Sequence, residues 1–294
     1  MTRRMYNTLT ALMVALVAAC AAWSLNADES TAKEAAPADV LSIGGDVTEI
    51  VHALGQGHRL LARDTTSTWP PEVRDLPDVG YMRQLSPEGV LSVGPSLILL
   101  AEGAGPPETL EVLRAADIDL VEVNGGFDAE AIAAKIRTVG AALEVPEQAE
   151  ALARDVTLAL DIALADAAAQ TGPRKRVLFV LSAAGGKLTV AGENTGAAAV
   201  IRMAGGVNAA QGFDGYKQLT DEAASVAAPD VIVMMDRGGN HDATADLLFS
   251  LPALAITPAA ETRALVKIDG LKLLGFGVRT AQAVTELNAT LYGD

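Results

Sequence analysis

The chain has 294 residues, half of them hydrophobic and a fifth charged, which is enough for one large or two medium globular domains and rules out a mainly disordered chain. Lys and Arg number 22 against 37 Asp and Glu, and the formal net charge of −15 argues against general binding to nucleic acid or anionic membranes. The single cysteine, Cys20, excludes an intramolecular disulfide and a cysteine cluster for zinc or iron–sulfur. The chain has 3 histidines, so a three-histidine metal site would need all of them.

Residues 1–27 have the pattern of an export signal. A basic start precedes the uncharged apolar run Ala11–Ala19, which is too short to span a bilayer and has the length of a signal-peptide core. The stretch Val17–Cys20 resembles a bacterial lipobox, in which Cys20 becomes a lipidated first residue; cleavage by an ordinary signal peptidase a few residues later is the alternative. Both interpretations predict export, with residues 28–38 as a flexible tether.

From residue 40 the chain alternates short apolar runs with helix-like segments. Strands are predicted at Val40–Ile43, Arg59–Ala62, Leu97–Leu100 and Leu120–Val123, and helices at Val47–Leu54, Pro87–Val93, Pro107–Ala116 and Asp128–Leu143. Asp46 is expected to cap the first helix and Gly55 to end it. This order predicts a mostly parallel sheet with helices on both faces.

The alanine-rich stretch Pro146–Gln170 contains no glycine or proline after its first residue and predicts one long helix, a connector rather than a core element. The alternation then resumes, with strands predicted at Val177–Leu181, Val231–Met234 and Ala264–Lys267 and helices at Gly196–Ala204, Thr244–Phe249 and Thr280–Leu291. The predicted fold is therefore α/β: two Rossmann-like lobes, 39–144 and 173–294, joined by one connecting helix within 145–172, with a ligand cleft between the lobes.

Eight segments, in this order, resemble the periplasmic haemin-binding proteins of bacterial haem uptake systems, within the class III substrate-binding proteins of ABC importers. They are Leu41–Val51, Asp64–Pro70, Val79–Ser92, Val190–Thr195, Ala204–Asn208, Gly212–Lys217, Met235–Gly239 and Leu273–Thr280. The resemblance covers roughly residues 40–291. It implies a non-enzymatic protein that captures ferric haem and passes it to an ABC permease dimer with its ATPase.

The resemblance implies that Tyr81 is the axial ligand of the haem iron, since a phenolate is a hard anionic donor that suits ferric iron. Arg83 follows two residues later, and in an extended loop both side chains would point the same way, towards the phenolate or a haem propionate. The family places a propionate-binding arginine at Arg237, which follows a predicted strand. The neighbouring Asp236 is an alternative partner for that arginine.

Several other residues are candidates for contact with haem. His241 is a candidate second iron ligand from the other lobe, the alternative being a solvated loop histidine. Trp69 stands where the family more often has tyrosine, and Met82 is a candidate apolar wall. The loop Ser182–Gly186 lacks the histidine that some two-haem binders of this family use there. His52 and His58 are interpreted as structural.

Two glutamates are candidates for docking to the permease. By their positions in the motifs, the resemblance assigns Glu88 and Glu222, one in each lobe, to arginine pockets of the permease dimer. Both also precede predicted helical turns, where the helix dipole favours a negative charge.

The sequence therefore predicts a periplasmic haem-binding transport protein, soluble or anchored through Cys20, that works with an ABC permease and possible outer-membrane haem receptors. The nearest alternative is the same fold binding cobalamin or a ferric siderophore. An exported hydrolase is disfavoured because the sequence contains no Gly-x-Ser-x-Gly elbow.

Overall fold

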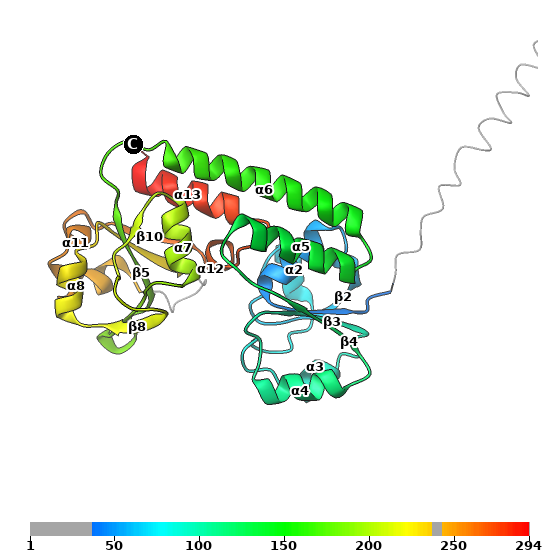
Figure 1. The fold of residues 1–294 in the computed structure, drawn as a ribbon. Coiled ribbons are helices and arrows are strands. Elements are labelled where there is room, and N and C mark those ends of the chain that lie inside the picture. The colour runs from blue at the N-terminus through cyan, green and yellow to red at the C-terminus, as the bar shows by residue number, and fades with distance from the viewer. Residues whose placement is uncertain (1–36, 237–242, 294) are drawn as a thin grey trace, which may run out of the picture. The chain divides into compact units, whose positions relative to one another are not determined.

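The structure, a computed structural model, describes residues 37–236 and 243–293. In the first lobe, four strands form a parallel sheet in the order β2-β1-β3-β4 (Figure 1). They are β1 (Val40–Ile43), β2 (Leu60–Arg63), β3 (Leu97–Ala101) and β4 (Asp119–Val123). The two inner strands, β1 and β3, are buried along their whole length, as expected for apolar strands covered on both faces.

With the exception of α2, the helices of the first lobe begin where a short polar side chain or a proline favours a helix start. They are α2 (Gly45–Ala53), α3 (Pro87–Leu91), α4 (Pro107–Ala115) and α5 (Ala129–Ala142), with 3₁₀ turns η1 (Gly57–Arg59) and η2 (Pro71–Asp75). Ser86 and Asp128 cap α3 and α5 through side-chain oxygens. The predicted cap at Asp46 is wrong: α2 begins at Gly45 with Gly44 as its N-cap, and the Asp46 carboxylate is bound by Lys135 instead.

The second lobe contains a six-stranded sheet in the order β10-β9-β5-β6-β8, with the short strand β7 also paired to β5. The strands are β5 (Arg176–Ser182), β6 (Leu188–Ala191), β7 (Val207–Asn208), β8 (Tyr216–Leu219), β9 (Val231–Asp236) and β10 (Leu265–Asp269). The pairs β5–β9 and β9–β10 are parallel, as predicted. The short strand β7, which was not predicted, also pairs with β5 in parallel. The pairs β5–β6 and β6–β8 are antiparallel and were not predicted.

The antiparallel pair β5–β6 follows from a short connection. Residues 183–187 join the two strands, and Gly185 and Gly186 have φ of 61° and 75°, which lets the chain reverse at once. A parallel crossover needs a dozen or more residues. The remaining helices of the second lobe are α7 (Gly196–Met203), α8 (Asp221–Ala227), α9 (Ala245–Phe249), α10 (Pro252–Ala255), α11 (Pro258–Thr262), α12 (Gly270–Leu274) and α13 (Thr280–Tyr292).

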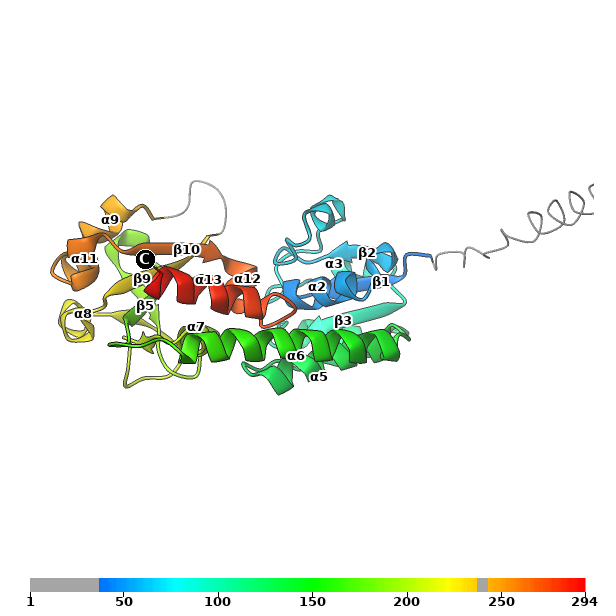
Figure 2. The same ribbon diagram turned by 90° about the horizontal axis from the view of Figure 1, so that it is seen from above.

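The long helix α6 (Pro146–Ala168) has 23 residues and joins the two lobes. It packs beside α5 in one half and beside α13 in the other (Figures 1 and 2). Its buried side chains recur every three or four positions, at Ala149, Ala153, Val156, Leu160, Ala163 and Ala167. All of them except Ala167 belong to one apolar cluster that contains residues of both sheets. The predicted connecting helix is confirmed. The expectation that it is not a core element is wrong, because its buried face is part of the apolar core.

Some of the predicted features lie outside the described residues. These are the export signal 1–27 with Cys20, nearly all of the tether 28–38, and the two second-lobe candidates Arg237 and His241. Within residues 37–236 and 243–293, no helix is both long enough and apolar enough to cross a membrane.

The close approach of α5 to α6 depends on Gly140, because a Cβ at this position would overlap the Cβ of Ala149. Gly140→Ala should therefore lower the free energy of unfolding by about 1–3 kcal/mol, the usual effect of overpacking. Adding Ala149→Gly to that variant should restore part of the loss. Urea denaturation checks both; a single variant as stable as the parent would contradict this packing.

Candidate functional site

A buried carboxylate organises the loop that follows β2. Asp64 is fully buried and accepts hydrogen bonds from Gly44 N (3.0 Å), Thr66 N (2.9 Å), Thr66 Oγ1 (2.7 Å) and Ser67 Oγ (2.7 Å). These bonds tie the β2 loop to the turn between β1 and α2. The hydrogen-bonded segment just before Trp69 is therefore fixed in position at the carboxyl ends of two parallel strands.

Tyr81 lies on a backbone segment that is hydrogen-bonded on both sides. Gly80 O accepts from Thr65 N (2.9 Å), and Met82 O accepts from Gly105 N (2.9 Å). Gly80 has a φ of 101°, a conformation that glycine adopts at little cost. The Tyr81 side chain is nevertheless 41% exposed. A well-held backbone thus presents an exposed phenol at the carboxyl end of the first-lobe sheet.

The segment after Tyr81 is a turn. Gln84 N donates to Tyr81 O (2.8 Å), which closes a four-residue turn. The expectation of an extended loop, with Tyr81 and Arg83 pointing the same way, is therefore wrong. Arg83 is exposed and acts across the lobe boundary: burial raises the pKa of Tyr216, the first residue of β8, and the charge of Arg83 opposes that rise.

A second arginine joins the lobes more firmly. Arg279, next to the first residue of α13, donates from Nε to Glu49 Oε1 of α2 (2.7 Å), and its Nη2 bonds the same oxygen. Nη2 also donates to Asp269 Oδ1 (3.2 Å). The guanidinium carbon lies 4.8 Å from the centre of the Trp69 ring, within cation–π range. One guanidinium therefore binds a carboxylate and an aromatic ring of the opposite lobe.

The loop before α13 is held by a buried lysine of the first lobe. Lys135 Nζ, on α5, donates to Gly275 O (3.2 Å) and Phe276 O (3.1 Å), and also bonds the Asp46 carboxylate. The Phe276 ring lies 4.9 Å from that of Phe127, which follows β4. The lobes thus meet through the Glu49–Arg279 ion pair, the hydrogen bonds of Lys135 to two carbonyl oxygens and an aromatic pair, in addition to α6.

Exposed aromatic side chains gather where the lobes meet. Aromatic residues make up 4% of the chain, yet Trp69, Tyr81, Phe127 and Tyr216 are 44%, 41%, 45% and 42% exposed. Trp69, Phe127 and Tyr216 each interact with a residue of the opposite lobe. Exposed aromatic rings near the boundary of two lobes are side chains suited to contact with a flat apolar ligand.

The other predicted residues have different surroundings. Met82 is partly buried and packs against two core clusters, so much of its side chain is used in the fold. Glu88 and Glu222 are exposed in the first turns of α3 and α8, one in each lobe. Arg237 and His241 fall in the stretch that the structure does not describe.

Among the residues that the structure describes, no group of three or more His, Cys, Asp or Glu side chains could hold a metal ion. Burial lowers the pKa of His52, whose ring lies against Gly57, which agrees with a structural role. His58 is exposed in the turn η1.

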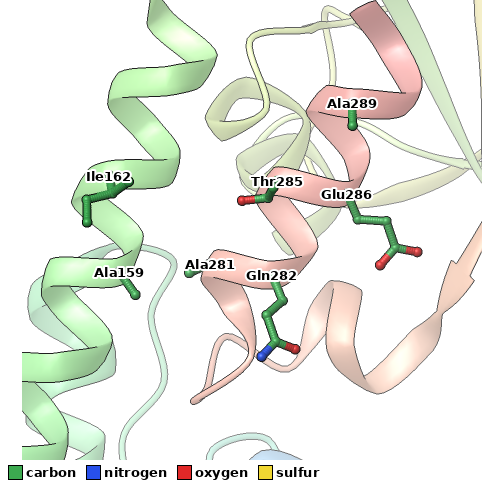
Figure 3. A pocket seen from close by; sticks show the side chains of 7 residues that line it. All are labelled: Ala159, Ile162, Ala281, Gln282, Thr285, Glu286 and Ala289. Atoms are coloured by element: carbon green, nitrogen blue, oxygen red, sulfur yellow. The ribbon is translucent and has the colours of Figure 1, made fainter. Parts of the chain in front are cut away.

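A groove of about 480 Å³ lies elsewhere, between α6 and α13. Figure 3 shows Ala159 and Ile162 of α6 on one side and Ala281 and Thr285 of α13 on the other. Its lining contains no arginine, tyrosine or histidine and none of the predicted site residues. The groove therefore lacks the groups needed to recognise an anionic or metal-containing ligand.

Sequence reasoning assigned no role to Glu49, Lys135, Arg279, Phe127 or Tyr216. Glu49 could have been noticed as an acid on the otherwise apolar face of α2, where it is 3% exposed. Arg279 and Tyr216 stand in segments that carry the family resemblance. The scarcity of aromatic residues could have drawn attention to Phe127 and Tyr216.

Two α/β lobes joined by a single long helix define a class III substrate-binding protein. The sequence profile of the periplasmic binding protein family matches residues 40–270, and the chain belongs to this family. Members of this family are binding components of transport systems rather than enzymes.

The chain is 40% identical to the solved periplasmic heme-binding protein BhuT in complex with two hemes, with a TM-score of 0.82 over 86% of this chain and 97% of that one. It is 27% identical to an uncharacterised ABC transporter substrate-binding lipoprotein, YvrC of Bacillus subtilis, over 72% of this chain and 67% of that protein. It is 33% identical to a vitamin B12-binding protein of Pectobacterium carotovorum over 125 residues, which span 42% of this chain and 45% of that protein.

Glu49 should make stability depend on pH. Burial raises its pKa from 4.5 to about 7; the hydrogen bond and charge of Arg279 oppose the rise, and the charges of Asp46 and Asp269 add to it. Between these two values the folded protein keeps a proton that the unfolded chain has lost, so this contribution to stability falls as pH rises. The loss is at most about 3 kcal/mol across the window.

Urea denaturation at several pH values checks this, with Glu49→Gln as the variant that lacks the proton. The stability of the parent relative to Glu49→Gln should decline from about pH 4.5 to about pH 7 and then level off. Glu150→Gln, in an exposed pair with Arg137, should show no such decline above about pH 5. A parent and a Glu49→Gln variant with parallel profiles would contradict the burial argument.

Proposed function

We propose that this protein captures ferric haem and delivers it to an ABC-type permease. The observation that carries the proposal is the exposed phenol of Tyr81 on a hydrogen-bonded backbone, at the edge where exposed aromatic rings of the two lobes gather. The likeness to the haem-binding BhuT, at 40% identity over nearly its whole length, supports the same ligand class.

In this proposal the Tyr81 phenolate is the axial ligand of the ferric iron. Tyrosine is a known axial ligand of haem, and both the metal charge and a nearby guanidinium favour the deprotonated form. Arg83, two residues away and exposed, supplies that guanidinium or binds a propionate. Arg237 is proposed as a second propionate-binding residue, since a guanidinium can bind a carboxylate with two parallel hydrogen bonds.

Most of the affinity should come from the flat apolar faces of the porphyrin, at about 25 cal/mol per Å² buried. Trp69 is proposed to pack on one face, and the exposed edge of Met82 to complete that wall. His241 is the proposed sixth ligand. Tyr216 is the alternative second-lobe ligand for the iron, because the charge of Arg83 in the first lobe acts on its phenol.

Spectrophotometric titration with haemin tests the function. The parent should give a saturable Soret band whose end point yields the number of haems bound. Tyr81→Phe keeps the ring and removes the donor oxygen, so it should shift the band and raise Kd by about tenfold or more. Tyr292→Phe, at a phenol that donates to Gly205 O (2.9 Å), is the matched control and should leave both unchanged. A parent that fails to bind haemin would contradict the proposal.

Cobalamin is the second candidate ligand, because several relatives are vitamin B12-binding proteins, one of them 33% identical over 125 residues. That match spans less than half of the relative, whereas the BhuT match spans 97% of its chain. Haem is therefore favoured. Titration with cyanocobalamin under the same conditions separates the two: saturable binding of cobalamin without haemin binding would favour the alternative.

The proposed setting is the periplasm, reached through the export signal 1–27, with anchoring by a lipid at Cys20 as the favoured variant of that signal. The proposed partners are a permease dimer with its ATPase and, upstream, an outer-membrane haem receptor system. The protein is proposed to bind and release its ligand without catalysing a reaction, in keeping with its family.

Glu88 and Glu222 are proposed to dock the loaded protein onto the permease, one from each lobe. Glu88→Arg and Glu222→Arg should each lower haem-dependent ATPase activity of the reconstituted importer by about tenfold, since like charges would then meet at the contact. Haemin affinity should not change. Glu147→Arg, also an exposed first-turn glutamate, is the control. Full activity of both reversed variants would contradict docking at these positions.

A further inference from the structure

The pair formed by Glu49 and Arg279 is unusual in its placement. Glu49 is 3% exposed, and the Arg279 side chain is 11% exposed, so both charges are almost completely removed from water. Removing two charges from water costs several kcal/mol per ion, and their attraction often fails to repay it. The raised pKa of Glu49 is the sign of that cost. The Glu49–Arg279 pair therefore contributes little to the stability of the fold, which points to a functional role.

Its geometry indicates that role. The guanidinium is fixed on one side by Glu49 of the first lobe and on another by Asp269 at the end of β10. The Trp69 ring lies against the same guanidinium, 4.8 Å from its carbon. A planar guanidinium held by carboxylates restricts the ring that stacks on it, because the ring can move only by losing that contact.

We propose that Glu49 and Arg279 are positioning residues for ligand binding: the pair holds the Trp69 ring at the lobe boundary in the orientation that receives the flat face of the ligand. This inference rests on the proposed haem binding. The pair itself has no contact with the ligand and acts only through Trp69.

The charged groups around Glu49 set how this arrangement responds to pH. Arg279 faces it from the loop before α13, Asp269 from β10, and Asp46 from its own helix, while Lys135 of α5 neutralises Asp46. Protonation of Glu49 leaves Arg279 with Asp269 as its remaining anionic partner. The guanidinium then moves towards that side, and Trp69 loses its fixed neighbour. Ligand retention should therefore weaken as pH falls through about 7.

The first test measures the fluorescence of Trp69 in the ligand-free protein as a function of pH. The chain has 2 tryptophans, so Trp23→Phe leaves Trp69 as the only one. In that background, Trp69 fluorescence should show a transition near pH 7, and Glu49→Gln should remove it. Arg137→Lys, in an exposed pair with Glu150, is the control and should keep it. A transition that Glu49→Gln leaves in place would overturn the pH response.

The second test measures haemin binding at about pH 8 and about pH 6. Arg279→Lys keeps the charge and loses the planar fork, so it should raise Kd by about tenfold with the Soret maximum unchanged. Glu49→Gln should raise Kd at the higher pH and match the parent at the lower one. A purely structural role would not give this pH dependence with an intact iron signature.

Three outcomes separate this inference from the proposed function. A parent protein that does not bind haemin would overturn both. Haemin binding that Arg279→Lys and Glu49→Gln leave unchanged at both pH values would overturn the positioning role alone. In a double-mutant cycle, Arg279→Lys and Trp69→Leu should be non-additive; additive effects would show that Arg279 does not act through Trp69.

Discussion

The contact between Arg279 and Glu49 constrains the rest of the molecule. It fixes the start of α13 to α2, and so joins the last helix of the second lobe to the first helix of the first lobe. Lys135 strengthens the same joint by binding the carbonyl oxygens of the loop before α13. The lobes are therefore connected by these polar contacts and by α6, which packs on helices of both lobes. Such a double connection resists hinge bending.

The same joint places two exposed aromatic rings, Trp69 and Phe127, at the lobe boundary. Trp69 and Phe127 come from loops at the carboxyl ends of first-lobe strands, and each contacts a residue of the segment Gly275–Thr280 or its neighbour. Apolar surface exposed to water is unfavourable, and a flat ligand that covers these rings removes that surface from water. The Glu49–Arg279 pair lowers stability at neutral pH and, in our proposal, holds the Trp69 ring in place. Proteins commonly lose some stability in this way where a binding site is preorganised.

Local patterns predicted much of the fold. Continuous apolar runs such as Leu97–Leu100 predicted buried parallel strands, and the alanine-rich stretch after Pro146 predicted α6. The antiparallel strands β6 and β8 were missed, because their register depends on pairing across the chain. The Lys135 contacts and the Glu49–Arg279 pair also depend on residues far apart in sequence, 140 and 230 positions respectively. Arg83 was selected, but its geometry was predicted wrongly because the segment after Tyr81 closes a local turn instead of running extended.

Haem binding through Tyr81 is tested most directly by a crystal structure of the protein soaked or grown with haemin, with the iron located by its anomalous scattering. We expect an iron peak within bonding distance of Tyr81 Oη, with the porphyrin between the lobes and a face of it against Trp69. An iron peak bound by other residues and distant from Tyr81, or a complex in which haemin lies in the groove between α6 and α13, would contradict it.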